Sequence, residues 1–137
     1  MKLLGIDYGT KRVGVSIGDT ESRVAVPLCV VHSSRSTVHS IVEIVKEEQV
    51  KLVVVGQGGK GPMEKKVQEF SKKLRTFVPV EIVDEHFTTA QIEKTMKNYG
   101  KERRKIDKDS AAAALILQGW LDNVYKSTNG TTNPTNL

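Results

Sequence analysis

The first 31 residues contain three short strand patterns in close succession, and this opening restricts the possible folds more than any other feature of the chain. The patterns cover residues 2–7, 12–18 and 24–31. The middle one alternates apolar residues with small or polar ones, which is typical of a half-buried strand. Because only short turns separate the three patterns, we expect an antiparallel meander. Pro27 lacks a backbone donor, so the third strand should lie at an edge of the sheet.

After residue 31, helix and strand patterns alternate. We expect strands at 52–56 and 80–85, a helix capped by Ser36 or Thr37, helices at about 63–76 and 107–124, and a helix capped by Thr88 or Thr89. This order predicts an α/β fold with a five-stranded mixed sheet flanked by helices. Residues 1–125 can form one domain. Residues 126–137 contain too few apolar side chains to fold, so we expect a disordered C-terminal tail there.

The chain is basic and contains a single cysteine. The 137 residues carry a formal charge of +5 and give a pI of about 9.4, which favours an anionic partner such as nucleic acid. The one cysteine, Cys29, lies in an apolar run and is expected to be a buried small side chain. The chain lacks the run of about 18 apolar residues that a membrane span requires. Asp7 also interrupts the first apolar run too early for a signal peptide, so we expect a cytoplasmic protein without membrane contact.

Acidic residues lie at three places where strand or helix patterns end or begin. They are Asp7 at the end of the first strand, Asp84 and Glu85 at the end of the last strand, and Asp107 and Asp109 at the start of the alanine-rich final helix. Helical steps of three and four from Asp109 reach only apolar residues, whereas Asp107 leads a mixed face, so the pattern favours Asp109. Consecutive strand residues point to opposite faces, and spacing does not choose between Asp84 and Glu85.

These acids are expected to converge at the rim of the sheet, where open α/β folds bind their ligands. Carboxylates that converge repel one another unless a cation lies between them. All the candidate ligands are hard oxygen donors, so Mg²⁺ is the expected ion and Mn²⁺ is the alternative. The sequence therefore predicts a divalent-metal site inside a protein that attracts anions, a combination that indicates phosphodiester chemistry.

Basic residues near the same rim form a candidate binding track for a phosphate backbone. Its members are Lys11, Arg12, Lys60, Lys65, Lys66, Arg103 and Arg104, and His86 is a further candidate to orient a phosphate. A solvated helix face explains the lysines equally well. Residues 56–61 are rich in glycine but lack the P-loop spacing and its final Lys-Ser/Thr pair, which excludes nucleotide binding of that kind. Their backbone amides could still face a phosphate.

Three motifs resemble those of the YqgF family, also called RuvX, and occur in the same order. They are GIDYGTKRVG at residues 5–14, VDEHFTTA at residues 83–90 and DSAAAALILQGWL at residues 109–121. The resemblance extends from residue 2 to about residue 124. The family is described both as Holliday-junction resolvases and as pre-16S ribosomal RNA maturation nucleases.

This resemblance implies a ribonuclease H-like fold and a catalytic, metal-binding triad of Asp7, Glu85 and Asp109. It thus selects Glu85 over Asp84 and supports Asp109 over Asp107. The chain departs from the family pattern at two places. His86 stands where members usually have Arg, and Gly56-Gln57-Gly58 stands where they usually have Gly-Leu-Pro.

The resulting hypothesis is a metal-dependent nuclease that processes the 5′ end of pre-16S rRNA during ribosome biogenesis, with ribosomal particles as further partners. The alternative is a Holliday junction resolvase, which requires a symmetric dimer. Nothing in the chain indicates a dimer interface, so we expect a monomer or a weak homodimer. A non-catalytic RNA-binding protein is a more distant alternative. An actin-like ATP-binding fragment is another, because residues 7–10 also look like a phosphate motif of that fold, although 137 residues cannot supply its two lobes.

Overall fold

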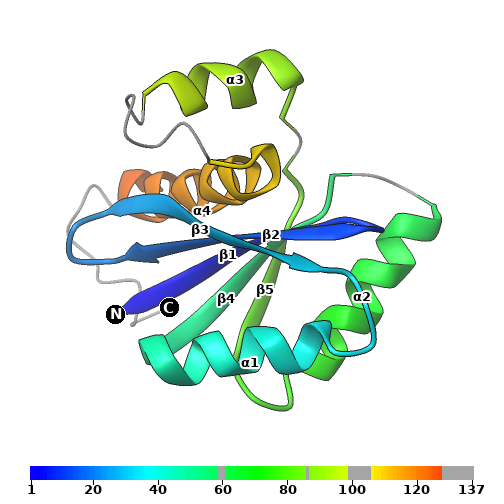
Figure 1. Cartoon of the computed structure of the whole chain (residues 1–137). Coiled ribbons are helices and arrows are strands. Elements are labelled where there is room, and N and C mark those ends of the chain that lie inside the picture. Colours follow the sequence, from blue (N-terminus) through cyan, green and yellow to red (C-terminus); the bar gives the residue numbers. More distant parts are fainter. Residues whose placement is uncertain (59–60, 86, 99–105, 128–137) are drawn as a thin grey trace.

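A five-stranded mixed sheet forms the middle layer of the protein (Figure 1). In the computed structural model, which describes residues 1–58, 61–85, 87–98 and 106–127, the strands are β1 (Lys2–Tyr8), β2 (Arg12–Asp19), β3 (Val24–His32), β4 (Val50–Gly56) and β5 (Val80–Val83). Their order is β3-β2-β1-β4-β5, with β1, β2 and β3 antiparallel and with β4 and β5 parallel to β1. The predicted meander and mixed sheet are confirmed, and Pro27 lies on edge strand β3, as expected.

Helices cover both faces of this sheet. They are α1 (Thr37–Glu48), α2 (Pro62–Leu74), α3 (Thr89–Lys97) and α4 (Lys108–Ser127). One face carries α1 and α2, and the other carries α4, with α3 on the outer side of α4 (Figure 1). Two apolar clusters fill the spaces between these layers. The first contains Ile6 and Phe70 beneath α1 and α2, and the second contains Leu3 and Leu117 beneath α4.

Small residues bring α4 into very close contact with the sheet. The Ser16 hydroxyl donates a 2.8 Å hydrogen bond to the carbonyl oxygen of Ala113 in α4. A Cβ atom added to Gly14 would lie 1.9 Å from the carbonyl oxygen of Asp109, and one added to Gly5 would lie 2.7 Å from that of Ala113. The alanine run of α4 therefore lies directly against the strands. This contact also fixes the position of the first turn of α4 relative to β2.

Two helices begin in different ways. Thr88 caps α3 with a complete capping box, in which its hydroxyl accepts from the Gln91 amide and the Gln91 side chain accepts from the Thr88 amide. Ser36 occupies the N-cap position of α1, but its side chain makes no capping hydrogen bond. The Thr37 hydroxyl instead donates back to the Ser34 carbonyl at 2.9 Å, so the expected side-chain cap of α1 is wrong.

The ends of two elements also differ from expectation. Strand β5 ends at Val83, so Asp84 and Glu85 follow the strand and do not belong to it. Helix α4 continues to Ser127, three residues beyond the expected end at 124. The remainder of the expected tail, from residue 128 on, lies outside the described residues. Within the described residues, no helix is long and apolar enough to cross a membrane.

Candidate active site

Asp7 lies at the carboxyl end of β1 and on the side of the sheet that faces α4. The alternation of β1 produces this placement, because Leu3 and Gly5 contact α4 while Ile6 and Tyr8 pack toward the opposite face. No hydrogen bond or ion pair reaches the Asp7 carboxylate from the described part of the chain. Burial, and secondarily the charge of Asp109, raises the pKa of Asp7 from 3.8 to about 6.

Asp109 lies in the first turn of α4, where an arginine from β2 contacts it. Arg12 Nε is 3.2 Å from Asp109 Oδ2, and Arg12 Nη1 is 3.5 Å from Asp107 Oδ2. Burial raises the pKa of Asp109, and its hydrogen bond with Asp107 and the charge of Asp107 raise it further, while Arg12 acts in the opposite direction. Asp109 is thus a carboxylate near Asp7 that already has one cationic partner from its own chain.

Asp107 has a structural task at the start of the same helix. Its Oδ1 atom accepts a 2.7 Å hydrogen bond from the backbone amide of Asp109, as a capping side chain does. The helix face that begins at Asp107 is covered at its start, since Ser110, Ala111 and Ala114 are at most 4% exposed. Farther along the helix, Leu115 and Gln118 of the same face are only half-buried, so the face is mixed, as expected. Strands β2 and β3 and helix α3 all contact α4.

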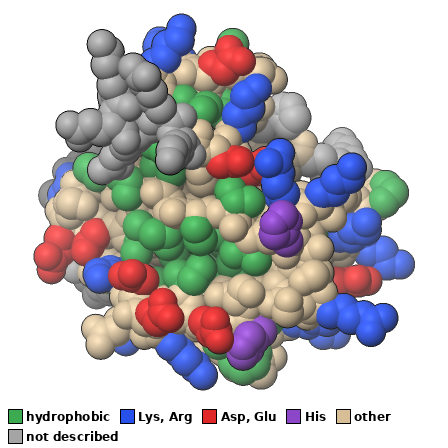
Figure 2. Space-filling view, in the orientation of Figure 1, with side chains coloured by type: hydrophobic (Ala, Val, Ile, Leu, Met, Phe, Trp, Pro, Cys, Tyr) green, Lys and Arg blue, Asp and Glu red, His purple; other side chains and the backbone are tan. Residues whose placement is uncertain are grey.

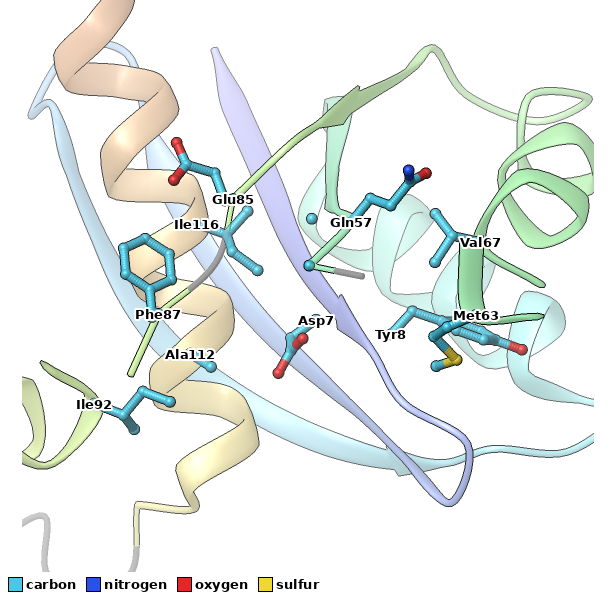
Figure 3. A pocket seen from close by; sticks show the side chains of 12 residues that line it. Asp7, Tyr8, Gln57, Met63, Val67, Glu85, Phe87, Ile92, Ala112 and Ile116 are labelled. Atoms are coloured by element: carbon cyan, nitrogen blue, oxygen red, sulfur yellow. The ribbon is translucent and has the colours of Figure 1, made fainter. Parts of the chain in front are cut away.

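Glu85 shares a pocket with Asp7, although the two carboxylates do not meet. The Glu85 carboxylate is directed toward α4, and its Oε1 atom would lie 3.4 Å from a Cβ atom added to Gly119. In Figure 3 it points away from the carboxylate of Asp7. Asp84 is not among the residues that line this pocket, but it lines a second one together with Glu85, between the end of β5 and the C-terminal half of α4.

The three predicted acids do not form a ready-made metal site. Among the described residues, no group of three His, Cys, Asp or Glu side chains is close enough to hold one ion. The part of the site at Asp7 and Asp109 nevertheless fits a hard divalent cation, because the charge of Asp109 raises the pKa of Asp7 and the half-buried Asp7 carboxylate has no partner among the described residues. Glu85 would have to turn its side chain toward Asp7 to join them.

The pocket beside Asp7 has a volume of about 370 Å³. Its lining residues are Asp7, Tyr8, Gly56, Gln57, Gly58, Met63, Val67, Glu85, Phe87, Ile92, Ala112 and Ile116. Most of the lining is apolar, and the acids lie at its centre and on one side (Figure 3). The sequence patterns did not identify Met63, Phe87 or Ile92 as site residues. Met63 lies on α2, Ile92 on α3 and Phe87 just before α3, so only the tertiary packing brings them together beside Asp7.

The predicted basic track is described only in part. Lys11, Lys65 and Lys66 are exposed, the last two on α2. Figure 2 shows Lys and Arg side chains gathered on the side of the molecule where α2 lies. Arg12 is exposed too, but it contacts the carboxylates of Asp107 and Asp109, a pairing that the sequence did not reveal. The remaining predicted members lie outside the described residues; they are Lys60, His86, Arg103 and Arg104.

Comparison with known proteins identifies the family to which this arrangement belongs. Residues 1–123 match the family described as "RuvX: Holliday junction resolvase". The chain belongs to the RuvX family. A Caldanaerobacter subterraneus subsp. tengcongensis protein named "Putative pre-16S rRNA nuclease" is 39% identical over 93% of this chain and its own full length. A Chloroflexus aurantiacus protein of the same name is 37% identical over 88% of this chain and 86% of its own.

Solved structures show the fold of this RuvX protein. One of them is described as "T. thermophilus RuvC in complex with Holliday junction substrate". It superposes with a TM-score of 0.57 at 17% identity, over 95% of this chain and 97% of its own. The fowlpox virus resolvase, in complex with junction DNA, gives 0.59 at 13% identity over 90% of this chain and 99% of its own. The predicted family, the ribonuclease H-like fold and the assignment to nuclease-type hydrolases are thereby confirmed.

Proposed function

We propose that this RuvX protein is a divalent-metal-dependent nuclease that processes the 5′ end of pre-16S rRNA. The observation that carries the proposal is the half-buried Asp7 carboxylate, which has no hydrogen-bond partner among the described residues and lies close enough to Asp109 for the charge of Asp109 to raise the pKa of Asp7. Such a pair is stabilised most directly by a cation between its members. The names of the bacterial relatives support RNA as the substrate.

Each acid has a distinct part in this proposal. Asp7 and Asp109 would hold the ion from β1 and from α4, and Glu85 would complete the set after rotation of its side chain. A bound Mg²⁺ or Mn²⁺ supplies the charge that activates a water and stabilises the leaving oxygen. Arg12 is positioned to exchange its carboxylate contacts for a phosphate of the substrate, because its side chain is 56% exposed at the edge of the site. Lys65 and Lys66 would contact the phosphate backbone farther along α2.

The experiment uses purified protein and two labelled substrates, a pre-16S rRNA 5′ segment and a four-way DNA junction, each with Mg²⁺, Mn²⁺ or EDTA. We expect metal-dependent cleavage of the RNA that is lost in Asp7→Asn. Asp122→Asn is the matched control, since Asp122 is an exposed α4 residue bonded to Gln118. Full cleavage by Asp7→Asn, or cleavage in EDTA, would contradict the proposal.

The junction substrate tests the second candidate function. The description of the family and the fold shared with RuvC favour a Holliday junction resolvase. Symmetric cuts in both strands of the junction, without cleavage of the RNA, would put this candidate first. A resolvase also requires a dimer in solution, whereas the RNA nuclease is proposed as a monomer or weak homodimer. A cytoplasmic location and contact with ribosomal particles follow from the RNA proposal.

A further inference from the structure

The pocket beside Asp7 is a slot with two apolar walls. Met63 and Val67 of α2 form one wall together with Tyr8, and Phe87, Ile92 and Ile116 form the other, with Asp7 between them (Figure 3). The Tyr8 ring packs on the buried Phe70 ring, with centroids 4.8 Å apart, so this wall is held in place from behind. The slot opens directly beside the carboxylate that the proposed function places at the reaction centre.

The two walls suit an uncharged group better than a phosphate. None of the described lining residues is Lys or Arg, and the walls themselves are apolar. The phosphate that is cleaved would instead lie at the ion that the acids are proposed to hold. A flat, uncharged group fits the walls, because its two faces can lie against them. In a nucleic acid, the group with these properties is a base.

We propose that this pocket receives one unpaired nucleobase of the substrate, adjacent to the phosphodiester that is cleaved. The inference rests on the proposed nuclease function and adds a requirement to it: the substrate must present an unstacked base beside the cleavage position. A base within a duplex has both faces covered by its neighbours, so it cannot enter a slot with walls on two sides. The volume of about 370 Å³ is within the range of about 300–1,000 Å³ for sites that enclose small molecules.

Gln57 provides a polar group that can bind the edge of this base. Its Oε1 atom accepts one long hydrogen bond, 3.4 Å, from the Gln68 side chain. A side-chain amide has two donors and a second acceptor position, so Gln57 retains capacity for a base edge. Gln57 therefore adds a hydrogen-bonding group for the edge of the base to the apolar walls of the slot.

The test measures binding alone, in EDTA, so that it does not depend on cleavage. Fluorescence anisotropy compares a short single-stranded RNA with a series of the same RNA in which one nucleotide at a time is replaced by an abasic ribose. For wild type, we expect one position at which loss of the base weakens binding by roughly five- to a hundredfold, the range for a base stacked on protein side chains. An equal affinity for every abasic RNA would overturn the proposal.

Two variants on α3 locate the effect. Ile92→Trp fills the slot, and the fold should tolerate it because none of the α3 residues is buried. We expect this variant to lose the discrimination between intact and abasic RNA while its affinity for the abasic RNA stays within about twofold of wild type. Ala90→Trp places the same side chain on an exposed position of the same helix and should discriminate as wild type does. Discrimination that persists in Ile92→Trp would overturn the proposal.

Phe87→Leu is the second slot variant and removes an aromatic face while the wall stays apolar. Its matched control is Phe77→Leu, at a 58% exposed site outside the pocket lining. We expect Phe87→Leu to discriminate less between intact and abasic RNA than wild type does, and Phe77→Leu to discriminate as well as wild type. Equal discrimination by the two variants would count against the slot. Cleavage without base dependence would refute this inference alone, whereas base-dependent binding without cleavage would refute the nuclease proposal alone.

Discussion

Replacement of Asp7 by Asn is expected to make the metal-free protein less sensitive to pH and more stable at neutral pH. The pKa of Asp7 rises from 3.8 to about 6 because folding buries the carboxylate and places it near Asp109. Each pKa unit corresponds to about 1.36 kcal/mol, so the ionised carboxylate reduces the free energy of unfolding by about 3 kcal/mol above pH 6. Asparagine occupies nearly the same volume without this charge.

The direction with pH follows from proton binding. An acid whose pKa is higher in the folded state keeps its proton more tightly when folded, so acidification from about pH 6 to 3.8 stabilises the folded protein. The advantage of Asp7→Asn should therefore be about 3 kcal/mol at pH 7.5, equivalent to about 10 °C in the midpoint of thermal unfolding, and about 0.6 kcal/mol at pH 4. The asparagine amide adds an offset that does not vary with pH, so the pH-dependent part of the difference is the quantity to measure.

Urea unfolding in EDTA between pH 4 and 7.5 provides this measurement. Trp120 is the single tryptophan of the chain and is 6% exposed, so its fluorescence reports loss of the core beneath α4. Asp122→Asn is the control and should follow wild type at every pH. A constant difference between wild type and Asp7→Asn over the whole range would refute the reasoning, because it would show that the Asp7 carboxylate pays no desolvation cost.

Three further predictions concern the elements that position the site. Arg12→Gln should lower the free energy of unfolding by about 0.2–1 kcal/mol through loss of its contact with Asp109, and 0.5 M salt should reduce this effect in a urea titration. Gly14→Ala should cost about 3 kcal/mol or more in thermal unfolding, since the added Cβ atom would lie 1.9 Å from the Asp109 carbonyl oxygen; wild-type stability would contradict the close contact. Thr88→Ala should cost about 1 kcal/mol and increase amide exchange in α3 before other helices, because it removes the capping box with Gln91.

The order of strands and helices was predictable because each depends on neighbouring residues. The alternation of Val13, Val15 and Ile17 identified β2, and Thr88 identified the start of α3. Predictions were wrong at the ends of elements, where a few local hydrogen bonds decide the outcome. Ser36 makes no side-chain cap and the Thr37 hydroxyl donates back to the Ser34 carbonyl, while β5 ends at Val83, before the two acids that were expected to belong to it.

The sequence by itself determined the family, the mixed sheet and the three acidic positions, because motifs and periodicity are local properties of the chain. The tertiary structure decided how those acids relate to one another. It placed Asp7 under α4 near Asp109, engaged Arg12 with Asp107 and Asp109, and turned Glu85 toward Gly119. It also assembled the apolar slot from β1, α2, α3 and α4. Distances between residues so far apart in the chain depend on how closely the layers pack. Here the glycines of the strands and the alanines of α4 set the spacing between helix and sheet.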